Sequence, residues 1–285
     1  MRFLTALSSS AIALATLALF TVNASPVPRT TEGMQLSKRS TSGWNDWSCT
    51  PSSAHPKALI LVHGLLANAD DNWLYMAPRF KAQGYCVFAL TYGQMNGVSF
   101  LGALDKMENS AQQLSDYVDK VLAATNTTQV DIFAHSEGSL MPRYYLRFLN
   151  GASKVHKFAT IGSIQYGTTL DGIVKLADSL GLYDAIKKLL QNSTFIQNLN
   201  AGGDTVPGVQ YLMVGSKYDE IVTPYTTGFL RDNNPNVKNQ VLQDWCSLDY
   251  SEHILQMFDP VAFNGAHAFF TPAADQTISC LDLLQ

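Results

Sequence analysis

The chain has 285 residues, of which 46% are hydrophobic and 15% charged, and its formal net charge at pH 7 is −4. This length suits one large domain with a sizeable buried core. The excess of acidic residues argues against nucleic-acid binding and against electrostatic attachment to anionic membranes.

Residues 1–24 have the pattern of a secretory signal peptide. A positive start is followed by an apolar stretch over residues 4–20, and small side chains around Ala24 suit cleavage. The apolar stretch is short for a membrane span, although an uncleaved signal anchor is the alternative. We therefore expect a secreted, extracellular protein without an integral membrane segment in its mature chain.

Residues 25–39 are rich in Pro, Thr and Ser and end in the dibasic pair Lys38-Arg39. This pattern predicts a propeptide. The remaining residues, 40–285, contain 15 basic and 22 acidic side chains and are expected to form one catalytic domain, with a monomer favoured.

Buried strands alternate with helices along this domain. Runs rich in apolar residues predict strands at residues 58–62, 86–90, 130–134, 158–161 and 211–214, and residues 237–242 are expected to form a sixth. Helical spacing of apolar residues predicts helices at residues 73–83, 103–124, 139–150 and 260–270. The alternation predicts an α/β fold, in which a mostly parallel sheet is covered by helices on both faces.

Residues 166–200 interrupt this alternation. Apolar side chains recur at helical spacing over 170–180 and again over 182–190, which predicts two short amphipathic helices. These helices either cover the core or form a cap that lines an acyl-chain pocket and opens toward lipid.

The four cysteines predict two disulfide bonds, because an even count is typical of secreted chains. Three pairings are possible. We favour Cys49–Cys86, which would tie the N-terminal arm to a strand, and Cys246–Cys280, which would fasten the C-terminal tail.

Asn126 and Asn192 each begin an Asn-x-Ser/Thr sequence. Both are predicted N-glycosylation sites. In a secreted protein, each would lie at the surface.

Ser136 stands where a nucleophile is expected. It follows the apolar strand 130–134 and precedes a helix, with the small residues Ala134 and Gly138 two positions away on either side. A sharp strand–turn–helix of this kind presents a serine hydroxyl above the sheet. The alternative is an ordinary surface turn.

A serine nucleophile needs a base, and the base needs a carboxylate that orients it. Chain order in this kind of site places the acid after the serine and the histidine last. Asp219 follows a predicted strand and is the favoured acid, with its neighbour Glu220 as the alternative. His253 lies in a polar loop and is the favoured base, because His267 lies inside an apolar helix.

The oxyanion that forms during acyl transfer needs two backbone N–H donors. We assign them to Glu137, which follows the serine, and to Leu65, which follows Gly64 in the turn after the first strand. The His63 side chain is interpreted as a brace for this loop. No cluster has metal-ligand spacing and no phosphate-binding loop is present, so we expect no metal and no cofactor.

Several long motifs resemble the secreted class 2 lipases of the α/β-hydrolase superfamily, known from actinobacteria and fungi. They cover residues 45–49 (NDWSC), 84–93 (GYCVFALTYG), 141–146 (MPRYYL), 218–225 (YDEIVTPY) and 251–253 (SEH). The resemblance implies the α/β-hydrolase fold, a Ser136–Asp219–His253 triad, the oxyanion donors Leu65 and Glu137, and the disulfide pairing favoured above.

Two residues depart from that family's pattern, namely Ala134 in place of the usual Gly and Glu137 in place of the usual Gln. A carboxylate at position 137 would sit near the oxyanion and alter activity or its pH dependence. Residues 166–190 match the family least, so the resemblance says least about which substrates this protein accepts.

The expected function is hydrolysis of lipid esters by a triacylglycerol lipase, with a lipid or ester substrate as the partner. One alternative is a carboxylesterase for short-chain, aromatic or polymer esters. The other is a secreted lipid-binding protein without catalytic activity.

Overall fold

The computed structural model describes residues 43–94, 100–169, 186–271 and 277–284. Its strands form one six-stranded sheet in the order β2-β1-β3-β4-β5-β6, and every neighbouring pair is parallel. The strands are β1 (Ala58–Val62), β2 (Val87–Leu90), β3 (Val130–His135), β4 (Val155–Ile161), β5 (Gln210–Gly215) and β6 (Val237–Val241).

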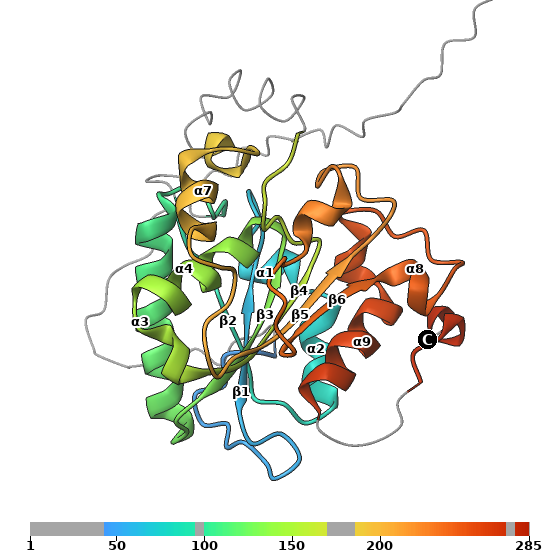
Figure 1. The fold of residues 1–285 in the computed structure, drawn as a ribbon. Helices are drawn as coiled ribbons and strands as arrows, with labels where there is room; N and C mark the ends of the chain where they lie inside the picture. Colours follow the sequence, from blue (N-terminus) through green and yellow to red (C-terminus); the bar gives the residue numbers. More distant parts are fainter. Residues whose placement is uncertain (1–42, 95–99, 170–185, 272–276, 285) are drawn as a thin grey trace, which may run out of the picture. The chain divides into compact units, whose positions relative to one another are not determined.

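Helices cover both faces of this sheet (Figure 1). They are α1 (Ala69–Asn72), α2 (Met76–Ala82), α3 (Met107–Thr125), α4 (Leu140–Phe148), α7 (Thr194–Asn200), α8 (Leu242–Trp245) and α9 (Pro260–Phe270). α3 and α4 pack on one face, while α2, α8 and α9 pack on the other. The predicted fold class is therefore confirmed.

Side chains that alternate in direction along each strand form two hydrophobic cores, one on each face of the sheet. In β1, Ile60 and Val62 belong to the cluster that includes α3 and α4, whereas Leu59 and Leu61 belong to the cluster on the opposite face. Successive strand residues point to opposite faces, so an uninterrupted apolar strand seals both layers.

Several predicted boundaries shift for local reasons. The helix predicted over 73–83 begins at Met76, because a separate short helix, α1, ends at Asn72 with Trp73 as its C-cap. The helix predicted over 103–124 begins at Met107, because Ala103 has a left-handed backbone with φ of 61°. Such a conformation does not continue a right-handed helix.

The predicted insertion, residues 166–200, is described in part. The stripe over 170–180 and most of the stripe over 182–190 lie outside the described residues. The described part contains a short 3₁₀ helix, η3 (Lys187–Leu189), and then α7, which was not predicted and is capped by Ser193. Thr168 and Leu190 form a β-bridge, so the chain on either side of residues 170–185 is joined at its base.

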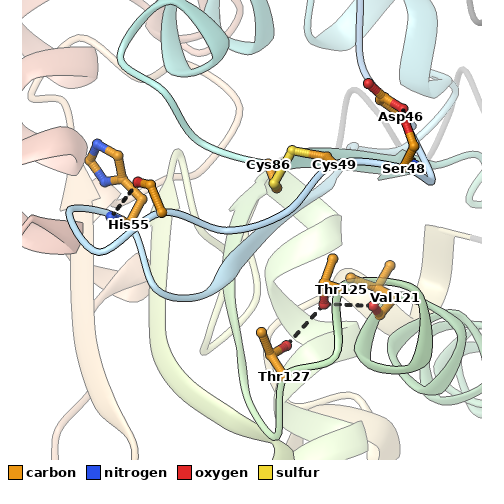
Figure 2. The surroundings of a disulfide bond; sticks show 9 residues. Asp46, Ser48, Cys49, His55, Cys86, Val121, Thr125 and Thr127 are labelled. Atoms are coloured by element: carbon orange, nitrogen blue, oxygen red, sulfur yellow. Dashed lines mark hydrogen bonds between the residues drawn. A yellow bond between two sulfur atoms is a disulfide. The ribbon is translucent and has the colours of Figure 1, made fainter.

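Both favoured disulfide bonds are present in the structure. Cys49–Cys86 joins the arm before β1 to the residue before β2 (Figure 2). Cys246–Cys280 joins the end of α8 to the C-terminal η6 (Cys280–Leu284).

The predicted signal peptide and propeptide lie outside the described residues. The two predicted glycosylation sites are described, and the side chains of Asn126 and Asn192 are both exposed. Exposure is what a glycan requires, and modification of the two asparagines stays a prediction.

Candidate active site

Ser136 lies at the junction between β3 and the 3₁₀ helix η1 (Ser136–Ser139). Its φ of 54° is the left-handed backbone of a sharp turn, which costs free energy for a residue with a side chain. The turn is also tightly packed, because a Cβ on Gly138 would lie 2.2 Å from the carbonyl oxygen of His63. Glycine is therefore required at 138, while the buried methyl group of Ala134 is accommodated.

Three side chains from distant parts of the chain form one hydrogen-bonded line. His253 Nε2 lies 2.8 Å from Ser136 Oγ, and His253 Nδ1 lies 2.8 Å from Asp219 Oδ2. A neutral imidazole that donates from Nδ1 to the carboxylate has a free lone pair on Nε2 for the serine proton. The geometry is that of a nucleophile, a base and an orienting acid.

Sheet topology explains why these residues meet. Ser136 follows β3, Asp219 follows β5, and His253 lies in the loop between α8 and α9. The carboxyl ends of parallel strands lie at one edge of a sheet, where α/β proteins place their sites.

The Asp219 carboxylate is itself held in place. Its Oδ1 accepts the backbone N–H groups of Ile221 and Val222, at 3.0 and 2.7 Å. Its Oδ2 also accepts the side-chain amide of Gln256 at 3.1 Å, and Gln256 in turn accepts the backbone N–H of Gly162. Gln256 was not among the predicted site residues, since its role depends on the folded loop.

The turn after β1 passes close to Ser136. A Cβ added to Gly64 would lie 3.0 Å from Ser136 Cβ, so Leu65 follows at the point where the backbone approaches the serine. His63 braces this turn: its Nδ1 lies 2.8 Å from the carbonyl oxygen of Gly64, and its Nε2 accepts the backbone N–H of Tyr92. Burial lowers the pKa of His63 to about 4, so its ring is neutral and suits this one-donor, one-acceptor arrangement.

A second brace links the same turn to the histidine loop. Asn72 Oδ1 accepts the backbone N–H of Gly64 at 3.1 Å and lies 3.2 Å from His135 Nδ1. His135 Nε2 lies 3.3 Å from the carbonyl oxygen of His253. Asn72 and His135 therefore connect the two loops that flank Ser136, and sequence reasoning missed both of them.

Glu137 carries its carboxylate into the interior, where the residue is 1% exposed. Oε1 lies 3.1 Å from Lys188 Nζ. Burial raises the pKa of Glu137 to about 6, although the nearby lysine acts in the opposite direction. Lys188 is a further residue that the sequence did not identify.

Within ranges 43–94, 100–169, 186–271 and 277–284, no group of three or more His, Cys, Asp or Glu side chains is arranged to hold a metal ion. None of the helices in those ranges is both long and apolar enough to cross a bilayer.

The sequence of this chain matches that of a known protein family. The family model described as Lipase (class 2) matches residues 56–263. A triacylglycerol lipase from Pseudarthrobacter phenanthrenivorans is 34% identical over 91 residues, which is 30% of this chain and 27% of that relative. The chain thus matches about a quarter of the length of this relative.

Solved structures show the same architecture. Aspergillus fumigatus lipase B superimposes with a TM-score of 0.64 and 20% identity, over 78% of this chain and 53% of that one. The mature form of Bacillus licheniformis lipase BlEst2 superimposes with a TM-score of 0.58 and 18% identity, over 78% of this chain and 94% of that one. At these identities the likeness concerns the fold, which is that of the α/β-hydrolases.

Proposed function

The chain belongs to the class 2 lipase family, and we propose that it is a secreted carboxylic ester hydrolase that cleaves lipid esters through an acyl-enzyme on Ser136. The observation that carries this proposal is the hydrogen-bonded line from Ser136 through His253 to Asp219, with both links at 2.8 Å. A binding protein without catalytic activity would have no need for such a line.

In the proposed reaction, Ser136 Oγ attacks the ester carbonyl while His253 Nε2 accepts the hydroxyl proton. The imidazolium is stabilised by Asp219 and then protonates the departing alcohol, which leaves an acyl group on Ser136. Water, deprotonated by His253, attacks this acyl-enzyme and releases the carboxylic acid. As the bond between Ser136 Oγ and the acyl carbon breaks, His253 passes the proton taken from water to Ser136 Oγ, so the site ends in its starting state.

The negative charge on the carbonyl oxygen forms beside the start of η1 and the turn after β1. We assign the donors to the backbone N–H groups of Glu137 and Leu65, and each donor of this kind contributes ~10²–10³ in rate. The close approach of Gly64 to Ser136 supports this assignment.

A lipid substrate is supported by the surface next to the base. Ile254 and Leu255 directly follow His253 and are 49% and 50% exposed. Large apolar side chains at this position suit contact with acyl chains. Residues 166–200 are proposed as a cap. Triacylglycerol is the proposed substrate class.

Secretion is supported by the two disulfide bonds, which persist in oxidising compartments. The proposed processing removes residues 1–24 as a signal peptide and residues 25–39 as a propeptide. Mass spectrometry of the protein recovered from culture medium tests this, since the mature N-terminus is expected at Ser40 and glycans at Asn126 and Asn192.

The activity is tested with emulsified long-chain triacylglycerol and with a soluble short-chain ester. Wild-type protein is expected to hydrolyse both, and Ser136→Ala is expected to hydrolyse neither while it keeps the wild-type unfolding temperature. Hydrolysis of the soluble ester alone would restrict the proposal to an esterase. Wild-type rates in Ser136→Ala would remove the serine from the mechanism.

A further inference from the structure

We propose that Lys188 is a positioning residue of this site. It neutralises the carboxylate of Glu137 beside the oxyanion donors, and it fastens the base of the 166–200 insertion to the nucleophile turn. The inference deepens the proposed function and rests on it.

The need for a counter-charge begins with the place of Glu137. This residue follows Ser136 in η1, and its backbone N–H is an assigned oxyanion donor. Its carboxylate is buried, and among the described residues neither carboxylate oxygen accepts a hydrogen bond, so the contact of Oε1 with Lys188 is an ion pair. An isolated carboxylate in such surroundings is costly, and it would also oppose the negative charge that develops on the substrate.

Lys188 supplies that counter-charge from a distant part of the chain. Its Nζ lies 3.1 Å from Glu137 Oε1 and donates to the carbonyl oxygen of Asp105 at 2.8 Å. The side chain is 11% exposed, so solvent screens this ion pair much less than a surface pair. One ammonium group therefore joins η1, the loop before α3, and η3.

The same segment is tied to the acid loop. Leu189 and Gln191 exchange backbone hydrogen bonds with Thr168, at 2.9 and 3.1 Å, which closes the base of the insertion. The hydroxyl of Thr168 donates to the carbonyl oxygen of Ile221, two residues after Asp219. The segment that carries Lys188 is thus connected both to the turn at Ser136 and to the loop that carries Asp219.

The charge state of Glu137 follows from its surroundings. In the part of the chain that the structure describes, Lys188 and the buried phenol of Tyr92 are the titratable groups that interact with it. Burial keeps the pKa of Tyr92 well above its usual value, so the phenol is neutral. Without the lysine, burial acts unopposed and the pKa of Glu137 rises further. In Lys188→Met, an unpaired carboxylate then forms only as the pH passes that higher pKa.

The test compares wild type, Lys188→Met, Glu137→Gln and the double variant Glu137→Gln/Lys188→Met on a soluble short-chain ester from pH 5 to 9. At pH 8, kcat of Lys188→Met is expected to fall about tenfold or more, with a smaller change in KM, because the change acts on the transition state. Its rate should decline further as pH rises. The double variant should recover most of the loss and lack this alkaline decline, since the amide at 137 bears no charge.

Lys106→Met is the matched control, since it removes an exposed lysine next to Asp105 in sequence. It is expected to retain wild-type kcat at every pH. A double variant as slow as Lys188→Met, or a Lys188→Met protein with wild-type kcat and pH profile, would overturn the proposal.

Denaturant unfolding of the same four proteins separates this inference from the proposed function. The losses in unfolding free energy of the two single variants should add up to more than the loss in the double variant. Each single substitution leaves one buried charge unpaired, whereas the double substitution leaves none. This non-additivity is expected even if no ester is hydrolysed, an outcome that would count against the proposed function alone. Additive effects on stability would overturn the ion-pair role itself.

Discussion

Asp219 and Glu220 are neighbours in the chain, yet they contact different atoms of His253. Asp219 Oδ2 lies 2.8 Å from the ring Nδ1, whereas Glu220 Oε2 accepts the backbone N–H of His253 at 3.2 Å. The first contact bears on the tautomer and charge of the ring, and the second on the position of the loop. The two carboxylates are therefore expected to differ in their effect on the reaction.

Asp219→Asn and Glu220→Gln form a matched pair that tests this difference. Asp219→Asn should lower kcat by ~10³–10⁴-fold, because an amide neither stabilises the imidazolium nor holds the tautomer that Ser136 needs. Glu220→Gln keeps an acceptor for the backbone N–H and should lower kcat much less. Steady-state kinetics on a soluble ester distinguish them, and equal losses would contradict the assignment of Asp219.

Asn72→Leu tests the brace between the turn after β1 and His135. The substitution leaves the backbone N–H of Gly64 without its acceptor and should cost about 1–3 kcal/mol of stability. It should also lower kcat more than KM changes, because the turn that carries Leu65 loses a fixed position. Asn109→Leu, which replaces an exposed amide on α3, is the control. Wild-type kcat in a correctly folded Asn72→Leu protein would remove this brace from the mechanism.

Stability is expected to depend on two buried carboxyl groups. Burial raises the pKa of Asp259 to about 7 and that of Glu137 to about 6, whereas both titrate near pH ~4 in an unfolded chain. Between these values the folded protein binds more protons than the unfolded one. The stability contributed by these groups is thus present in full below pH ~4 and is lost as the pH rises through 6 and 7.

Asp259→Asn removes one of these groups while keeping a side-chain acceptor for the first turn of α9. Relative to wild type, the variant should gain stability as the pH rises from 5 to 8. Urea unfolding at both pH values measures the change, with the exposed Asp116→Asn as control. A constant difference between Asp259→Asn and wild type at the two pH values would show that Asp259 does not titrate in this range.

The elements with a strong local pattern were predictable from sequence. β1 and α9 have the predicted bounds, because one is an unbroken apolar run and the other starts at Pro260 after the capping residue Asp259. The triad candidates were also predictable, since each follows a recognisable strand or lies in a polar loop. Chain order restricted the acid and the base to a few positions.

The supporting residues were not predictable, because their partners are distant in sequence. Lys188 is one of two adjacent lysines, and no local pattern relates it to Glu137. Asn72 looks like an ordinary helix residue, yet its amide contacts His135, which is 63 positions away. α7 was missed because its buried apolar positions, Ile196 and Leu199, are too few to give a clear periodicity.

The most direct measurement is covalent labelling of the folded protein with a fluorophosphonate, followed by peptide mass spectrometry. An activated serine displaces fluoride from the probe, whereas an ordinary serine does not react. We expect one adduct, on Ser136, that is lost in His253→Ala. A folded wild-type protein that stays unlabelled, or one labelled at another serine, would contradict the assignment of Ser136 as the nucleophile.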